Sequence, residues 1–153
     1  MFEMMRSIMT DTLAGVARGT ASVPADHPFF ADHFPGAPLL PGSFLIELAA
    51  QVAGPLAEEI VHARLGLERW AMLGMIRDAK FLRHTRLPAD LLITAEVRRA
   101  DASKVIVQVW ARAQEQETLR AELWMMMLEA APDWGEAIAA RRERVAVWKG
   151  AAP

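Results

Sequence analysis

Residues 33–51 read His-Phe-Pro-Gly-Ala-Pro-Leu-Leu-Pro-Gly-Ser-Phe-Leu-Ile-Glu-Leu-Ala-Ala-Gln, and this stretch changes character halfway along. Its first half belongs to a proline-dense segment, residues 24–41, which excludes a long helix or a central strand. Its second half is apolar almost all round, which predicts a buried helix. We expect this helix to start at Pro41, with Ser43 as N-cap, and to stop at Gly66.

Apolar and polar side chains alternate after the helix, which is the period of β-strands. The expected strands are residues 70–76, 80–83 (after a bend near Asp78), 91–98, 105–112 and 119–127. Short polar connections between the later strands favour antiparallel hairpins. Another strand is expected within residues 12–22. The sequence therefore predicts an α+β fold in which an antiparallel β-sheet wraps around a long central α-helix.

We expect the chain to form one domain that spans residues 1–153 and includes both of its ends. Residues 1–23 form its N-terminal segment, and residues 131–153 form a C-terminal helical tail. The tail places apolar side chains and Arg141 near one face, which favours packing on the sheet or on a partner subunit over a membrane-surface role. Near the other end, three Phe residues within residues 24–41 predict that the proline-dense loop is packed down.

Composition excludes several classes of function. With 53% hydrophobic and 24% charged residues, the 153-residue chain can bury a core, and its formal charge of -2 argues against nucleic-acid binding by bulk charge. Cys is absent, which excludes disulfides and thiolate chemistry. The longest nearly apolar run, residues 44–56, is too short to span a membrane. We therefore expect a cytoplasmic protein with no membrane span.

The polar residues within residues 33–51 suit proton transfer. Glu47 and Gln51 are four residues apart and share one helix face. Burial disfavours the charged form of a carboxyl, so Glu47 would serve as a general acid, while His33 on the stiff loop is a natural general base. The free N–H groups of Gly42 and Ser43 would stabilise developing negative charge. The alternative is that Glu47 is a structural partner of an Arg or a backbone group and that His33 is an ordinary loop residue.

The same stretch carries a longer motif. Its members are His33-Phe34-Pro35-Gly36, Pro38, Pro41-Gly42, Glu47 and Gln51. This pattern resembles the signature of the 3-hydroxyacyl-[acyl carrier protein] dehydratases of bacterial fatty acid synthesis. Residues 79–83, Ala-Lys-Phe-Leu-Arg, are similar to the basic strand that follows the helix in those enzymes. The resemblance covers about residues 27–128, and the tail has no counterpart.

The resemblance implies a hotdog fold and a homodimer or trimer of dimers, with each active site between two protomers. The residues that it implies are His33 as base, Glu47 as acid, the amides of Gly42 and Ser43 as the thioester oxygen site, and Gln51 and Pro41 as supporting residues. The implied reaction removes water from a 3-hydroxyacyl thioester and leaves a trans-2-enoyl thioester, in fatty acid or related polyketide or polyene synthesis. It needs no metal and no other cofactor.

The partner implied is an acyl carrier protein that bears the 3-hydroxyacyl chain. Lys80 and Arg83 lie in a basic stretch that would dock this acidic protein, although the same charges also suit a solvated strand edge. Two alternative functions stay open. A hotdog acyl-thioesterase would use Glu47 to activate water, and a non-catalytic subunit of a hotdog heterodimer would contribute only part of a site.

Overall fold

The computed structural model describes residues 4–30 and 32–150. It contains six strands in one antiparallel sheet, two α-helices and two short 3-10 helices. The strands are β1 (Met5–Asp11), β2 (Val16–Val23), β3 (Trp70–Phe81), β4 (Ala89–Ala100), β5 (Lys104–Ala113) and β6 (Gln116–Leu128). The helices are α1 (Gly42–Leu65), α2 (Gly135–Gly150), η2 (Pro28–Phe30) and η3 (Pro132–Trp134). The sheet order is β1-β2-β4-β5-β6-β3, so β1 and β3 form its edges.

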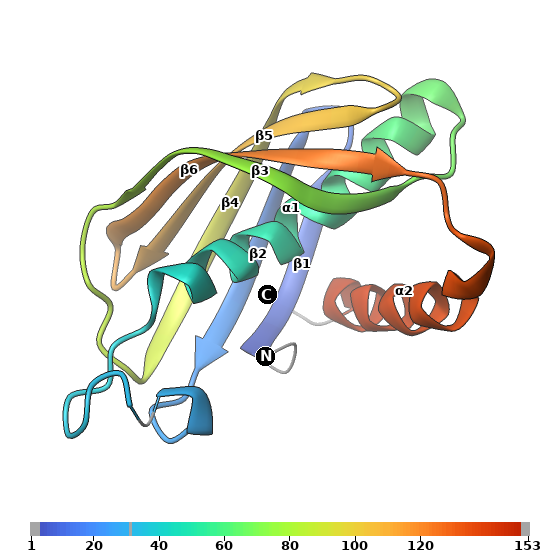
Figure 1. The fold of residues 1–153 in the computed structure, drawn as a ribbon. Helices are drawn as coiled ribbons and strands as arrows, with labels where there is room; N and C mark the ends of the chain where they lie inside the picture. The colour runs from blue at the N-terminus through green and yellow to red at the C-terminus, as the bar shows by residue number, and fades with distance from the viewer. Residues whose placement is uncertain (1–3, 31, 151–153) are drawn as a thin grey trace.

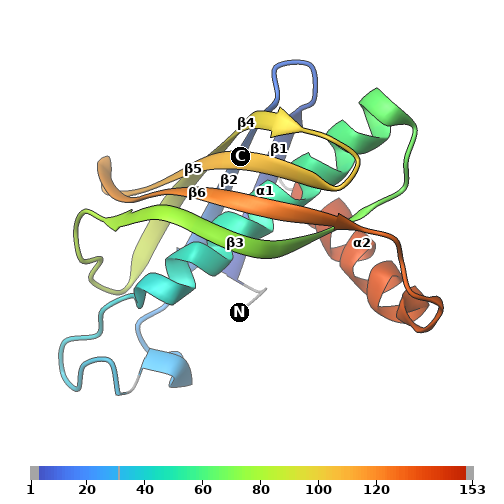
Figure 2. The same ribbon diagram turned by 45° about the horizontal axis from the view of Figure 1, so that its top comes forward.

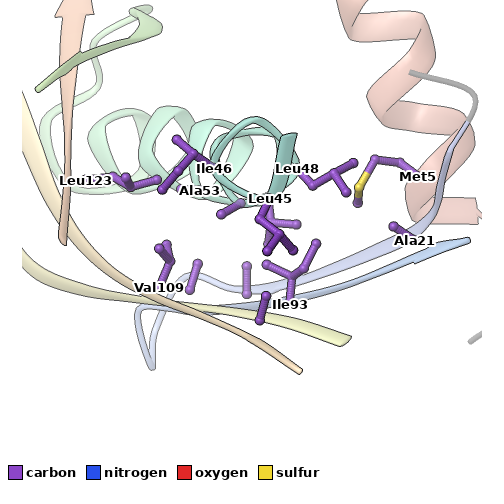
Figure 3. Close-up of a cluster of buried hydrophobic side chains, with 14 of the residues drawn as sticks. Met5, Ala21, Leu45, Ile46, Leu48, Ala53, Ile93, Val109 and Leu123 are labelled. Carbon is purple, nitrogen blue, oxygen red and sulfur yellow. The ribbon is translucent and has the colours of Figure 1, made fainter. Parts of the chain in front are cut away.

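The sheet curves around α1, which lies along its concave side (Figures 1 and 2). Apolar side chains fill the space between the two layers, as Figure 3 shows. Leu48 and Ala53 of α1 are fully buried there, as are Ile93, Val109 and Leu123 of three different strands. Removing this much apolar surface from water is the main stabilising term of such a fold. The predicted sheet wrapped around a central helix is therefore confirmed.

Close contact between the layers depends on Gly19 of β2. A Cβ atom at this position would overlap Cγ2 of Val52 in α1 and would lie 3.1 Å from the terminal methyl of Met5. Any larger residue would push the helix away from the sheet, which a closely packed core resists. Gly19 thus fixes the distance between α1 and the N-terminal half of the sheet.

The strands after the helix match their predicted ranges, with one difference. Residues 70–76 and 80–83 were expected as two pieces, but β3 runs unbroken through residues 70–81. The expected irregularity at Asp78 is present, because this residue has a φ of 48° and the register with β6 shifts between Arg77 and Lys80. A bulge of this kind bends a strand without ending it.

The N-terminal prediction was incomplete. β1 was not expected, and the strand expected within residues 12–22 is β2, while the residues between β1 and β2 form a turn. A register shift between Met5 and Ser7 explains the miss, because it leaves Ser7 and its neighbour Ile8 both buried and hides the alternation. The buried Ser7 hydroxyl is satisfied by the hydroxyl of Thr20, 2.7 Å away.

The ends of α1 are set by backbone geometry. Pro41, not Ser43, is the N-cap, and its carbonyl accepts the N–H groups of Phe44 and Leu45. The expected stop at Gly66 is confirmed: the residue is left-handed, with a φ of 66°, and its N–H donates to the carbonyl of His62 at 2.9 Å. The helix continues through Pro55 in its interior.

The C-terminal helix α2 lies beside the edge strand β1 and contacts α1 on the open side of the curved sheet (Figure 1). Arg141 anchors it with two hydrogen bonds to the carboxylate of Glu58 in α1, at 2.7 and 2.9 Å. The Arg141 guanidinium also lies over the Trp70 ring, 4.5 Å from its centroid, and Glu58 accepts the N–H of Ala71. Buried Trp148 completes the contact. The predicted packing of this tail on the rest of the chain is therefore observed.

Two further ion pairs join α2 to the chain. Lys149 contacts Glu59 of α1 and donates to the hydroxyl of Thr10 in β1 at 3.0 Å. Arg142 donates to Glu68 at 2.8 Å, but both side chains of this pair are about two-thirds exposed. Exposed pairs contribute little to stability, so the partly buried pair of Arg141 and Glu58 should be the dominant anchor.

We predict that Arg141→Ala lowers the free energy of unfolding by about 2 kcal/mol, because it strips a partly buried carboxylate of its charged donor. Arg142→Ala is the matched control on the same helix and should cost less than about 1 kcal/mol. Chemical denaturation of the two variants beside the parent chain measures both values. Equal losses for the two variants would contradict this assignment of the anchor.

Candidate active site

The loop that carries His33 is held by backbone hydrogen bonds. The N–H of His33 donates to the carbonyl of Phe30 at 3.0 Å, and the carbonyl of His33 accepts the N–H of Leu39 at 2.8 Å. The end of the loop is tied to the segment after β3, because Leu40 donates to the carbonyl of Thr85 at 2.8 Å. The proline-dense stretch is thus the ordered loop that was expected, and it holds His33 beside the start of α1.

The aromatic residues of this loop behave differently from one another. Phe30 is fully buried and meets Phe44 of α1 edge-on, with ring centroids 5.3 Å apart. Phe29 and Phe34 are 65% and 55% exposed, so only Phe30 of the three is buried. The packing of the loop therefore depends on Phe30 and on the backbone hydrogen bonds described above.

A cavity of about 440 Å³ separates this loop from the start of the helix. His33 lines it together with Gly42 and Ser43, and Phe81 and Arg83 also belong to its lining. The Phe81 ring rests against Gly42, where a Cβ atom would lie only 2.7 Å from the ring. Glycine at position 42 therefore lets an aromatic ring cover the first turn. Sequence reasoning assigned no role to Phe81, although it stands between Lys80 and Arg83 in the quoted basic strand.

The first turn of α1 has two backbone donors that the described part of the chain leaves unused, and the residues that carry them line this cavity. Among the described residues, no hydrogen bond uses the N–H of Gly42 or of Ser43. The partial positive charge of a helix N-terminus adds to these donors. An oxygen that gains negative charge in the cavity would be stabilised there. The structure thus places His33, Gly42 and Ser43 around one space, as their proposed roles require.

Glu47 and Gln51 lie further along the same helix. Gln51 Nε2 donates to Glu47 Oε1 at 3.0 Å, so the expected one-face arrangement is confirmed. Gln51 is buried and Glu47 is half-buried. Within residues 4–30 and 32–150, Glu47 does not line the cavity that contains His33. Within one chain, the candidate base His33 therefore lines the same cavity as Gly42 and Ser43, whereas the candidate acid Glu47 lies outside that cavity.

Two buried polar atoms of these residues lack partners in the described part of the chain. They are His33 Nδ1 and Gln51 Oε1. A buried acceptor or donor without a partner is costly, and it calls for an explanation such as a bound water, an ion or a catalytic role. Both atoms belong to residues that the sequence singled out.

The basic residues predicted to dock a partner are exposed. Lys80 lies near the end of β3, and Arg83 follows that strand. Arg83 borders the cavity of His33 and also a second cavity of about 240 Å³, which Thr85 and Arg86 line. A positive surface therefore adjoins the entrance to the candidate site.

The described ranges hold no group of three His, Asp or Glu side chains placed to bind a metal ion. In the same ranges, no helix is long and apolar enough to cross a membrane.

Comparison with known proteins shows the family to which the chain belongs. The family model described as a FabA-like domain matches residues 1–122. The chain is 39% identical over 108 residues to the 3-hydroxyacyl-[acyl-carrier-protein] dehydratase FabZ of Desulforamulus reducens, covering 71% of this chain and 72% of that protein. It is 33% identical over 105 residues to the dehydratase of the same name from Pediococcus pentosaceus, with 68% of each chain covered.

Solved structures show the same fold at low sequence identity. The smu.793 protein of Streptococcus mutans, bound to acetyl CoA, aligns with a TM-score of 0.61 and 18% identity over 83% of this chain and 90% of its own. A thioesterase from Haemophilus influenzae aligns with a TM-score of 0.56 and 17% identity over 75% and 73%. These likenesses establish the hotdog arrangement of sheet and helix. The sequence matches go further: this chain belongs to the FabA-like family of hotdog proteins, which it shares with the 3-hydroxyacyl-[acyl-carrier-protein] dehydratases.

Proposed function

We propose that this protein is a dehydratase that eliminates water from a 3-hydroxyacyl thioester on acyl carrier protein. The observation that carries the proposal is the cavity that His33 lines together with Gly42 and Ser43, whose N–H groups are unused in the described part of the chain. A base beside an oxyanion site is what proton removal next to a thioester carbonyl requires. The dehydratase relatives support this choice of reaction.

The reaction breaks two bonds of the substrate. His33 takes the proton from C2, and the electron pair moves toward the thioester oxygen, where the helix amides stabilise it. The C2–C3 double bond then forms as the C3 hydroxyl leaves with a proton from Glu47, so that water is released. Gln51 orients the Glu47 carboxyl through its 3.0 Å hydrogen bond, and Pro41 shapes the turn that presents the amides. The product is a trans-2-enoyl thioester.

We infer that Glu47 reaches the cavity of His33 from a second copy of the chain. Strand β3 supports this, because it is an edge of the sheet and exposes a row of apolar side chains. The members of the row are Met72, Met75, Ile76 and Phe81, which are 45% to 52% exposed. An apolar edge strand of this length is a natural site for pairing with another copy. Assembly beyond the dimer, such as a trimer of dimers, and a cytoplasmic location stay predictions.

We further propose that Lys80 and Arg83 dock the acidic carrier protein. Both side chains are exposed, and Arg83 lies at the cavity itself. A carrier bound there would deliver its thioester toward His33. Complementary charge of this kind mainly accelerates encounter.

The thioesterase alternative rests on the solved neighbours, which show the fold alone. Such an enzyme would release a free thiol, whereas a dehydratase leaves the thioester intact. The heterodimer alternative requires that the purified chain be inactive by itself. Both alternatives are therefore decided by the products that the lone chain forms.

We expect the purified chain to remove water from 3-hydroxyacyl thioesters, and His33→Ala and Glu47→Gln each to lower the rate by about 100-fold or more, since each removes a proton-transfer group. Mass spectrometry of the products measures the loss of water, and a thiol reagent applied to the same samples detects hydrolysis. Thermal unfolding of each variant serves as the control for folding. Free thiol without water loss would favour the thioesterase, and an inactive folded chain would favour the heterodimer.

Mixing the two inactive variants tests whether the site is shared between copies. In a dimer that joins His33→Ala to Glu47→Gln, one site loses both groups and the other keeps both. Co-refolding equal amounts should therefore restore about a quarter of the parent activity, because about half of the dimers of a symmetric pair are mixed. Absence of any recovery, with mixed dimers detected by native mass spectrometry, would place both groups in one chain.

Charge reversal at Lys80 tests the docking surface. Lys80→Glu should lower kcat/KM several-fold for the thioester on carrier protein and leave it unchanged for the same acyl group on a small thiol, because only the carrier senses the surface charge. Arg18→Glu is the matched control, since Arg18 is an exposed cation on β2. An equal effect on both substrates, or an equal effect of both variants, would contradict docking at this surface.

A further inference from the structure

Another cavity, distinct from the two described above, lies between α1 and α2, away from His33. Its volume is about 260 Å³. Its walls include Gln51 of α1, Trp70 of β3, and Ala137, Ala140, Arg141 and Trp148 of α2. Two indole rings and two small side chains make most of this surface apolar.

Gln51 connects this cavity to the proposed acid. Its amide nitrogen donates to Glu47, while its side chain also lines the cavity. Gln51 is only 8% exposed, and its Oε1 has no hydrogen-bond partner in the described part of the chain. Gln51 therefore lies between the proposed acid and the cavity. The cavity starts within one helical turn of Glu47, where the C3 hydroxyl of the substrate is proposed to leave.

The outer wall of the cavity comes from a part of the chain that the family model does not match. The FabA-like family model ends at residue 122, before α2 begins. This helix is nevertheless fixed, because Arg141 binds Glu58 through two hydrogen bonds and Lys149 pairs with Glu59. Gly54 makes the fit possible, since a Cβ atom there would lie 2.9 Å from Nη2 of Arg141. A rigid wall of this kind can discriminate between ligands by length.

We propose that this cavity holds the distal part of the acyl chain and that α2 sets the acyl chain length that the enzyme accepts. This inference rests on the proposed dehydratase function. The chain passes Gln51 beyond C3 and lies against Trp70 and Trp148, with Ala137 and Ala140 leaving room for it. The geometry thus assigns α2, a helix outside the region shared with the family, to substrate specificity.

Filling the cavity tests the proposal. Ala140→Trp should lower kcat/KM for long-chain 3-hydroxyacyl thioesters by about 10-fold or more, because each methylene that loses its pocket costs about that factor. The value for the shortest substrate should not change. Ala139→Trp is the matched control: it adds the same indole to the neighbouring position of α2, which does not line the cavity. Its profile should equal that of the parent chain.

A binding measurement tests the cavity independently of the dehydration reaction. Calorimetry with non-reacting saturated acyl thioesters of rising length should show affinity that grows with length in the parent chain and in Ala139→Trp, and that stops growing in Ala140→Trp. If the parent chain eliminates water but both variants keep its length profile, the role of α2 is refuted and the dehydratase function stands. If the parent chain eliminates no water from any substrate, the proposed function fails, and the binding series alone then decides whether the cavity holds acyl chains.

Discussion

The burial of an apolar helix inside a curved sheet is the constraint on which the rest of this structure depends. Leu48 and Ala53 of α1 are completely removed from water by strands that come from both halves of the chain. Because the inner face of the sheet and the helix surface are both apolar, neither is stable alone. A polar side chain survives on α1 only where the sheet does not cover it. Glu47 and Gln51 occupy such a position, so the packing that stabilises the fold also selects where polar chemistry can occur.

The same constraint positions the backbone donors. The helix must begin where the sheet can enclose it, and Pro41 fixes that start by turning the chain out of the loop. Gly42 and Ser43 follow at once, and both line the cavity of His33. The loop cannot drift away, because Leu40 is bonded to Thr85 after β3. Fold stability and the geometry of the candidate site are therefore consequences of one arrangement.

Much of this was readable in the sequence. The later strands alternate between buried apolar residues and less buried residues, many of them polar, and the helix is bounded by Pro41 and Gly66. β1 escaped prediction because the irregularity at Met5 and Ser7 breaks its alternation. Ser43 was expected to cap the helix by its residue type, but the turn that starts at Pro41 needs no side-chain cap. Local pattern predicts local structure, and it fails where backbone geometry overrides it.

The candidate site shows the same division. His33, Glu47 and Gln51 could be chosen from spacing and residue type, and a motif supported them. The contact of Phe81 with Gly42 could not, because it joins positions whose distance depends on how β3 curves over the helix. The cavity beside α2 was equally hidden, since its walls come from a helix, a strand and a tail that share no local pattern.

The anchors of α2 also have a consequence for the order of folding. Arg141 is 83 residues from Glu58, and Lys149 is 90 residues from Glu59. Glu58 holds Arg141 and the N–H of Ala71 together, so its full set of partners exists only after α1 and β3 have met. Contacts between residues this distant in the chain close long loops, which costs conformational entropy, so we expect them to form late in folding. The tail helix should accordingly join the molecule only after α1 and β3 have met.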